Sequence, residues 1–283
     1  MSRVDLKTKL RLIKQGKSLP LIMGVINMTP DSFSRDGLLS RDISLLEYAK
    51  GLVSAGADIL DIGAESTRPG SHPISSDEEH SRLFPAIEVL SEIPVPLSID
   101  TRRPEIFREA LRWGASLIND IGGLKHPEFA SILKENPDIM AVIMHMQGSP
   151  ETMQIKPFYE DVLTEVRAFF LERKEALESC GISSSRLIFD PGLGFGKTVA
   201  HNLSLLRHMA SFSDLGPLLI APSRKRFLDD PVHPGNPEDR DIQTGAVMAW
   251  STLHGATIFR THRPDIACQM RRILHMIEGE RHA

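Results

Sequence analysis

The sequence predicts an α/β protein, a (β/α)8 TIM barrel whose active site lies at the C-terminal ends of the strands. Eight short apolar runs alternate with eight stretches in which apolar residues recur at helical spacing. The runs begin mostly about 20 to 40 residues apart, the spacing of repeated strand-helix units. A polar or charged residue follows nearly every run, where this fold places its functional loops.

The apolar runs are the expected strands. Each has the length and composition of a strand that is buried on both faces. They occupy residues 21–26, 59–63, 95–99, 116–118, 140–144, 187–189, 218–220 and 257–259.

The stretches between the runs are the expected helices, at 43–53, 76–90, 104–113, 128–135, 159–179, 203–212, 242–253 and 264–277. Ser76 is expected to cap the second of these, because acids fill the first turn after it. Pro264 suits the first turn of the last. We therefore expect one domain over 20–283, preceded by an N-terminal extension over 1–19.

Composition narrows the possible functions. The formal net charge of −4 over 283 residues gives no general attraction to nucleic acid or to an anionic membrane. The sequence contains no run of 18 apolar residues, so no transmembrane helix is predicted. The N-terminus lacks the apolar core of a signal peptide. Cys180 and Cys268 are too few for a disulfide framework. These observations favour a cytoplasmic protein that binds neither nucleic acid nor membrane.

Polar side chains at the expected strand ends predict an enzyme. They are Asn27, Asp61 to Thr67, Asp100, Asn119, His145, Asp190, Lys225, Arg260 and His262. Asn27 carries a neutral oxygen that can ligate a hard cation, although capping a strand-end turn explains it equally well. His145 has no partner at metal-ligand spacing, so a packed, hydrogen-bonded histidine is favoured over a ligand.

The cationic residues point to an anion. Arg68, Lys225, Arg260 and His262 are expected around one mouth of the barrel. Arg260 and His262 lie on the same side of the last strand, at the edge where this fold often holds phosphate. The alternatives are a structural ion pair for Arg260 and a solvated His262.

The acidic residues and the glycines point to a flat, polar ring. Asp100, Asn119 and Asp190 are expected to converge, and Asp190 suits adjacent N–H and NH2 groups, as in a pteridine or a purine. Each acid also has a purely structural explanation. The Gly-rich stretch 192–197 matches neither phosphate-binding fingerprint. Its glycines are expected to let the backbone approach a ring, with Phe195 as a wall.

Eight motifs at successive strand ends make the chain resemble the dihydropteroate synthases along almost its whole length after the extension. They read Gly24-Val25-Ile26-Asn27-Met28-Thr29-Pro30-Asp31-Ser32-Phe33-Ser34, Glu65-Ser66-Thr67-Arg68-Pro69-Gly70, Ser98-Ile99-Asp100-Thr101, Ile118-Asn119-Asp120-Ile121, Met144-His145-Met146-Gln147, Asp190-Pro191-Gly192-Leu193-Gly194-Phe195-Gly196-Lys197, Ser223-Arg224-Lys225 and Arg260-Thr261-His262.

The resemblance implies a reaction in which 4-aminobenzoate displaces diphosphate from 6-hydroxymethyl-7,8-dihydropterin diphosphate. It implies Mg2+ bound by the diphosphate and Asn27, and a homodimer. It also implies roles for the site residues: Asp100, Asn119, Asp190 and Lys225 for the pterin; Arg260, His262 and Arg68 for the diphosphate; Thr67, Pro69, Phe33 and Phe195 for 4-aminobenzoate; Met144 for substrate binding; and Asp100, Lys225, Arg260 and His262 for catalysis.

Departures from the family's common pattern leave its ligands in place. Ala221-Pro222 and Arg226 are expected to reshape the 4-aminobenzoate pocket. Three alternatives remain: a methyltetrahydrofolate-dependent methyltransferase domain, a non-catalytic pterin-binding homologue, and a Schiff-base aldolase using Lys225.

Overall fold

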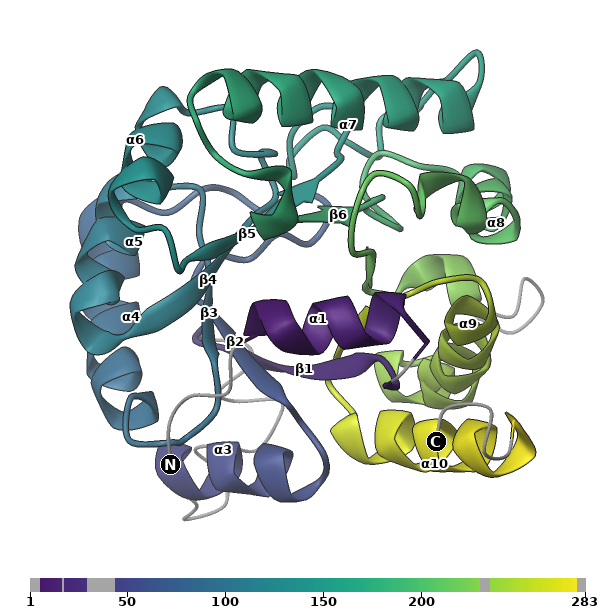
Figure 1. Cartoon of the computed structure of the whole chain (residues 1–283), viewed down its shortest axis with the longest axis horizontal. Coiled ribbons are helices and arrows are strands. Elements are labelled where there is room, and N and C mark those ends of the chain that lie inside the picture. The colour runs from purple at the N-terminus through teal and green to yellow at the C-terminus, as the bar shows by residue number, and fades with distance from the viewer. Residues whose placement is uncertain (1–5, 17, 30–43, 230–234, 279–283) are drawn as a thin grey trace.

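The structure is a computed structural model that describes residues 6–16, 18–29, 44–229 and 235–278 (Figure 1). Eight parallel strands form one sheet in the order β6-β5-β4-β3-β2-β1-β8-β7. The strands are β1 (Leu21–Asn27), β2 (Ile59–Gly63), β3 (Leu97–Asp100), β4 (Ala115–Asp120), β5 (Met140–Met144), β6 (Leu187–Asp190), β7 (Leu219–Ile220) and β8 (Ile258–Thr261). A backbone bridge between Phe189 and Leu218 joins the two edges, so the barrel is nearly closed.

In the described part of the chain, eight helices alternate with the strands and surround the sheet (Figure 1). They are α3 (Leu45–Ser54), α4 (Ser76–Leu90), α5 (Pro104–Ala110), α6 (Pro127–Glu135), α7 (Val162–Ser179), α8 (Val199–Arg207), α9 (Asp241–Leu253) and α10 (Pro264–Glu278). The predicted (β/α)8 barrel is confirmed.

The cap of α4 lies one residue before the predicted serine. Ser75 has extended backbone angles, and its hydroxyl accepts a hydrogen bond from the Glu78 N–H at 3.1 Å. Ser76 is the first helical residue, and its hydroxyl donates to Glu105 instead. Two adjacent serines offer the same capping chemistry, so the sequence alone does not choose between them.

Alternate residues of each strand pack into two separate cores. In β5, Ala141 and Ile143 join the large core between the sheet and the helices. Met140 and Val142 join a smaller core inside the barrel. This alternation follows from the two-residue period of a strand.

A helix that the sequence analysis missed closes the N-terminal end of the barrel. In α1 (Leu6–Lys14), Leu6, Leu10 and Ile13 are buried and belong to the inner core. That core also contains the first residue of several strands, including Leu21 of β1. Figure 1 shows α1 in purple, lying across the middle of the ring of strands. The extension therefore contributes to the packing of the barrel interior.

Within the described ranges, none of the helices combines the length and the apolar character needed to cross a bilayer.

Candidate active site

A buried carboxylate organises the C-terminal mouth of the barrel. Asp61, on β2, is fully buried and accepts hydrogen bonds from Ser98 Oγ at 2.5 Å and Arg260 Nε at 2.6 Å. The Asn119 amide nitrogen lies 3.3 Å from its second oxygen. Asp61 thus joins β2, β3, β4 and β8 at one point.

Arg260 lies between two carboxylates. Its Nε donates to Asp61, and its Nη2 donates to Asp100 at 2.8 Å. Burial opposes the charge of the guanidinium, but these two carboxylates hold the pKa of Arg260 above its ordinary value. The ion-pair alternative considered for Arg260 is therefore realised. Among the described residues, Nη1 makes no hydrogen bond, so one N–H pair remains for a ligand.

Asp100 lies at the end of β3. Burial, only partly offset by Arg260, raises the pKa of Asp100 to about 7, and the neighbouring Asp61 adds to the effect. The side chain is 14% exposed at the mouth.

Asp190 and Lys225 form a second charged group at the mouth, near Arg260. Asp190, at the end of β6, accepts a hydrogen bond from the Gly192 N–H at 2.7 Å, through one oxygen. Burial raises the pKa of its carboxyl, while Lys225 opposes the shift. The Lys225 ammonium donates to the Leu193 carbonyl and lies 4.6 Å from the centre of the Phe195 ring. Burial lowers the pKa of Lys225 to about 8, against the attraction of Asp190.

His262 and Asn27 face each other across β8 and β1. The Asn27 amide nitrogen lies 3.5 Å from His262 Nε2, and the Ser223 hydroxyl lies 3.0 Å from His262 Nδ1. Burial, reinforced by Arg260, lowers the pKa of His262 to about 3, so the imidazole is neutral at pH 7. His262 is half-buried and contacts Asn27 and Ser223, so it is only partly solvated.

The remaining predicted residues lie at different depths. Met144 is buried at the end of β5, beside Asp190 in the register of the sheet. Thr67 is half-buried, whereas Arg68 and Pro69 are exposed on the loop after β2. Phe33 lies outside the described residues.

The Gly-rich stretch packs against the protein itself. Gly192 and Gly196 have positive φ values of 65° and 62°. A Cβ at Gly192 would come within 2.0 Å of the His145 carbonyl oxygen, and one at Gly196 within 2.6 Å of the Gln147 carbonyl oxygen. The close approach that these two glycines allow is therefore to the β5 loop, which corrects the expectation that they face a flat ring.

Lys197 holds this stretch together, a role that the sequence analysis did not give to this last residue of the motif. Its buried ammonium lies 3.0 Å from His145 Nδ1 and donates to the Gly192 and Phe195 carbonyls at 3.1 and 3.0 Å. Burial lowers the pKa of Lys197 to about 7. His145 is buried and hydrogen-bonded, as predicted. No sequence signal separates Lys197 from an ordinary surface lysine.

Asp61, Ser98 and Ser223 are further site residues. The sequence analysis placed Asp61 among the polar strand ends but gave none of the three a specific role. A visible signal existed for two of them, since Asp61 and Ser98 are polar residues within apolar strand runs. Such residues need partners inside the barrel.

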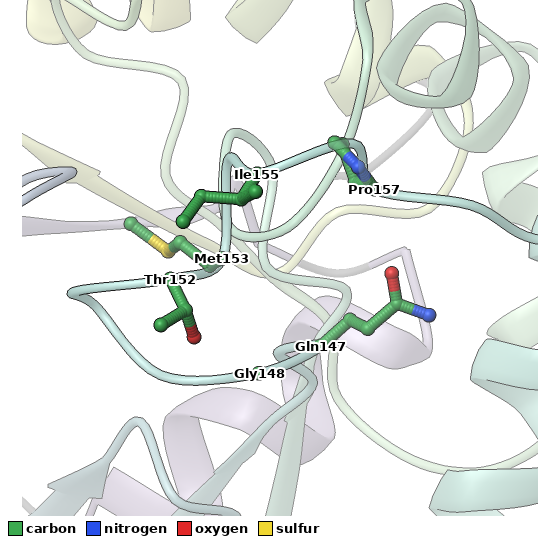
Figure 2. Close-up of a pocket in the computed structure, with 6 residues that line it drawn as sticks. All are labelled: Gln147, Gly148, Thr152, Met153, Ile155 and Pro157. Carbon is green, nitrogen blue, oxygen red and sulfur yellow. The ribbon is translucent and has the colours of Figure 1, made fainter.

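A cavity of about 420 Å³ lies beside this mouth (Figure 2). It is lined by Gln147, Gly148, Thr152, Met153, Ile155 and Pro157, all in the loop between β5 and α7. The lining includes none of the charged residues described above. The loop contacts the Gly-rich stretch through the Gln154 amide, which donates to the Gly194 carbonyl at 2.7 Å.

Comparisons with known proteins agree with this geometry. The family model described as "Pterin binding enzyme" matches residues 23–262. The dihydropteroate synthase of Escherichia coli K12 is 40% identical over 259 residues, which cover 89% of this chain and 91% of that protein. The chain belongs to the dihydropteroate synthase family. The predicted resemblance is confirmed.

Two solved structures of this family have closely similar folds. Xanthomonas albilineans dihydropteroate synthase with 4-aminobenzoic acid has a TM-score of 0.84 at 35% identity, covering 93% of this chain and 94% of that one. The Yersinia pestis enzyme, in a sulfonamide drug complex, has a TM-score of 0.85 at 36% identity, with coverages of 92% and 94%.

The residues that are expected to reshape the 4-aminobenzoate pocket, Ala221-Pro222 and Arg226, follow β7. Ala221 and Pro222 are buried, whereas Arg226 is exposed on the short helical turn Arg226–Leu228. The buried pair shapes the backbone that leads to Lys225.

Proposed function

We propose that this chain catalyses the displacement of diphosphate from 6-hydroxymethyl-7,8-dihydropterin diphosphate by 4-aminobenzoate, giving 7,8-dihydropteroate. The observation that carries this proposal is the mouth of the barrel, which brings an acceptor, Asp190, and the donor Lys225 close to Arg260 and His262. The dihydropterin diphosphate has matching groups at its two ends, a planar ring edge with N–H donors and an anionic diphosphate.

Asp190, Asn119 and Lys225 would hold the pterin. One Asp190 oxygen is taken by Gly192, which leaves the second for the ring N–H and amino groups. The Asn119 nitrogen is taken by Asp61, which leaves its carbonyl oxygen as an acceptor. The Lys225 ammonium supplies a donor beside them, and Met144 supplies an apolar contact.

Arg260, His262 and Arg68 would hold the diphosphate. The free N–H pair of Arg260 suits a phosphate oxygen. A bound anion would raise the pKa of His262 from its low value, because opposite charge favours the imidazolium. Arg68, on the exposed loop after β2, would add a third cation from the solvent side.

We also propose that the enzyme uses Mg2+, with Asn27 as its protein ligand. The Asn27 amide nitrogen faces His262, so its carbonyl oxygen is on the other side of the amide group. Among the described residues, no cluster of three His, Cys, Asp or Glu side chains forms a metal cage. Mg2+ often takes few protein ligands and several phosphate oxygens, which fits a lone amide. When bound, it would help neutralise the leaving diphosphate.

The reaction needs no nucleophilic side chain. The bond between the methylene carbon and the diphosphate oxygen breaks, the aniline nitrogen forms the new C–N bond, and the nitrogen then loses a proton. Asp100, as a carboxylate, would stabilise the positive charge that develops at the methylene carbon. Thr67, Pro69, Phe195 and Phe33 would position the weakly nucleophilic amine.

We further propose that the protein is a homodimer. Ile242, Trp250 and Leu253 leave large apolar side chains exposed on α9. Light scattering after gel filtration tests this, and a monomer at micromolar concentration would contradict it.

The activity is tested by diphosphate release from purified protein with both substrates and Mg2+, each omitted in turn. We expect release only when all are present, with equimolar 7,8-dihydropteroate. Borohydride trapping of a Lys225 adduct would instead favour the aldolase alternative. Release that does not depend on 4-aminobenzoate would overturn the proposal.

A further inference from the structure

The turn between β7 and Lys225 has an unusual backbone. Arg224 has a φ of 58°, in the left-handed region. The Lys225 N–H donates to the Pro222 carbonyl at 3.2 Å, which closes a four-residue turn with Arg224 in its third position. Turns with positive φ at this position are usually built with Gly or Asn, because a Cβ is strained there.

The turn sends two neighbouring side chains to different parts of the mouth. Ser223 faces β8, where its hydroxyl lies 3.0 Å from His262 Nδ1 and accepts from the His262 N–H at 3.2 Å. Lys225 faces the β6 loop, where its ammonium donates to Leu193. Arg224 is the single residue between Ser223 and Lys225, so its backbone angles decide the direction in which the Lys225 side chain points.

Residues at the start of α9 hold Arg224 in place. Its guanidinium forms a fork with Asp241, Nε at 2.9 Å and Nη2 at 3.2 Å from the two carboxylate oxygens. Its backbone N–H donates to Thr244 Oγ1 at 3.2 Å, and its carbonyl accepts from Arg240 Nη1 at 3.0 Å. The side chain of Arg224, its backbone N–H and its carbonyl are therefore all held by hydrogen bonds. Strained conformations persist when the surroundings determine them in this way.

The Asp241 carboxylate also contacts the residue next to His262. Asp241 also accepts from Arg263 Nη1 at 2.9 Å. Arg263 follows His262 directly, just as Arg224 precedes Lys225. One buried carboxylate thus anchors the residues adjacent to both Lys225 and His262.

We propose that Arg224 is a positioning residue: its left-handed backbone, fixed by Asp241 and Arg240, aims Lys225 at the pterin while keeping Ser223 on His262. The inference rests on the proposed function, since Lys225 is taken there as a pterin ligand. Arg224 itself is not assigned a contact with substrate.

Three substitutions separate this role from direct contact with an anion. Arg224→Gly removes the guanidinium but adopts a positive φ without strain. Arg224→Ala removes the guanidinium and stays strained there, and Arg224→Lys keeps a positive charge but neither the guanidinium fork nor any relief of the strain. We expect kcat/KM to fall about 100-fold in Arg224→Ala and Arg224→Lys, the effect of a small misplacement of a binding group. Arg224→Gly should retain about ten times more activity than Arg224→Ala.

The KM values for the two substrates and two control variants at Lys156 add further readouts. The KM for the dihydropterin diphosphate should rise in the Ala and Lys variants, with the KM for 4-aminobenzoate less affected. Lys156, exposed on the β5 loop, also has a positive φ of 50°. Lys156→Gly and Lys156→Ala should both leave the reaction unchanged, which controls for strain alone.

Asp241→Asn tests the anchor without changing the turn residue, and it serves if Arg224→Ala does not fold. We expect it to lower kcat/KM about tenfold or more with the fold retained by circular dichroism. The inference is overturned if the Lys variant is the most active of the three, if the Gly and Ala variants are equal, or if Asp241→Asn is as active as wild type. Wild-type protein that releases no diphosphate would instead refute the proposed function.

Discussion

The two ends of the barrel differ sharply although the same strands build both. The N-terminal end is apolar and covered by α1, whose Leu10 is almost completely buried in the inner core. The C-terminal end carries Asp61, Arg260 and Asp190, which are paired with one another or with backbone groups. One end serves packing, and the other serves chemistry.

The change occurs within two residues of single strands. On the inward face, Ile59 precedes Asp61, Leu117 precedes Asn119, Ile188 precedes Asp190, and Ile258 precedes Arg260. Two residues of a strand span about 7 Å. An apolar layer therefore lies directly beneath the charged layer and keeps water from reaching it from below. Substitutions on the two layers should separate stability from activity.

Leu10→Ala should have the largest effect on stability. Truncating a fully buried leucine typically costs about 2 to 5 kcal/mol, through lost burial and the cavity left behind. Urea unfolding measures the change, with the exposed Leu203 of α8 as a matched leucine. An effect no larger than that of Leu203→Ala would show that α1 does not plug the barrel.

Asp190→Asn should have the largest effect on ligand binding. The substitution keeps the shape but places a donor against the donors of the pterin, which should cost about 2 to 4 kcal/mol of affinity. Calorimetry with a pterin analogue measures this. Asp214→Asn, at an exposed ion pair with Arg167, is the control. Near-wild-type affinity would place pterin recognition elsewhere.

Asn27→Ala should act on the metal requirement. We expect a higher Mg2+ concentration for half-maximal rate and a turnover lower by one to two decades, equivalent to about 1.4 to 2.7 kcal/mol. Titration of Mg2+ at saturating substrates provides the measurement. Identical Mg2+ dependence in both proteins would remove Asn27 as a ligand.

Alkaline pH should weaken pterin binding through Lys225. Burial lowers the pKa of this lysine to about 8, so its ammonium form is present below that pH and is lost above it. Affinity for a pterin analogue should therefore fall about tenfold per pH unit above the pKa. A flat profile from pH 7 to pH 9.5 would show that Lys225 does not bind the ligand as a cation.

Arg226→Ser should have the smallest effect. An exposed Arg226 pairing with the carboxylate of 4-aminobenzoate would contribute about 0.2 to 1 kcal/mol, and salt would weaken it. The Michaelis constant for 4-aminobenzoate should rise more than the inhibition constant of a sulfonamide. An unchanged ratio of the two constants, at low and high salt, would make Arg226 a surface charge only.

The sequence predicted the barrel and most of its mouth because both depend on local pattern. Apolar runs mark buried parallel strands, and the residue that follows each run, such as Asn119 or Asp190, lies at the mouth in any barrel of this class. The spacing of Leu6, Leu10 and Ile13 is also helical. This spacing is typical of a helix, although the sequence analysis treated residues 1–19 only as an extension.

Other features depend on closure of the barrel and leave no local pattern. Asp61 and Arg260 are 199 residues apart, and only the pairing of β1 with both β2 and β8 brings their strands close. The positive φ of Arg224 is equally hidden, because neither Gly nor Asn marks it. Burial of Lys197 depends on how the β5 and β6 loops pack.

The division between the two ends is tested most directly by assaying wild type, Leu10→Ala and Asp190→Asn side by side. The measurement is 7,8-dihydropteroate formation per folded molecule, well below the urea midpoint of each protein. We expect wild-type kcat/KM in Leu10→Ala despite its lower midpoint. Asp190→Asn should keep a midpoint close to that of wild type but lose most of its kcat/KM. An active Asp190→Asn, or a Leu10→Ala whose folded molecules are equally impaired, would contradict this account.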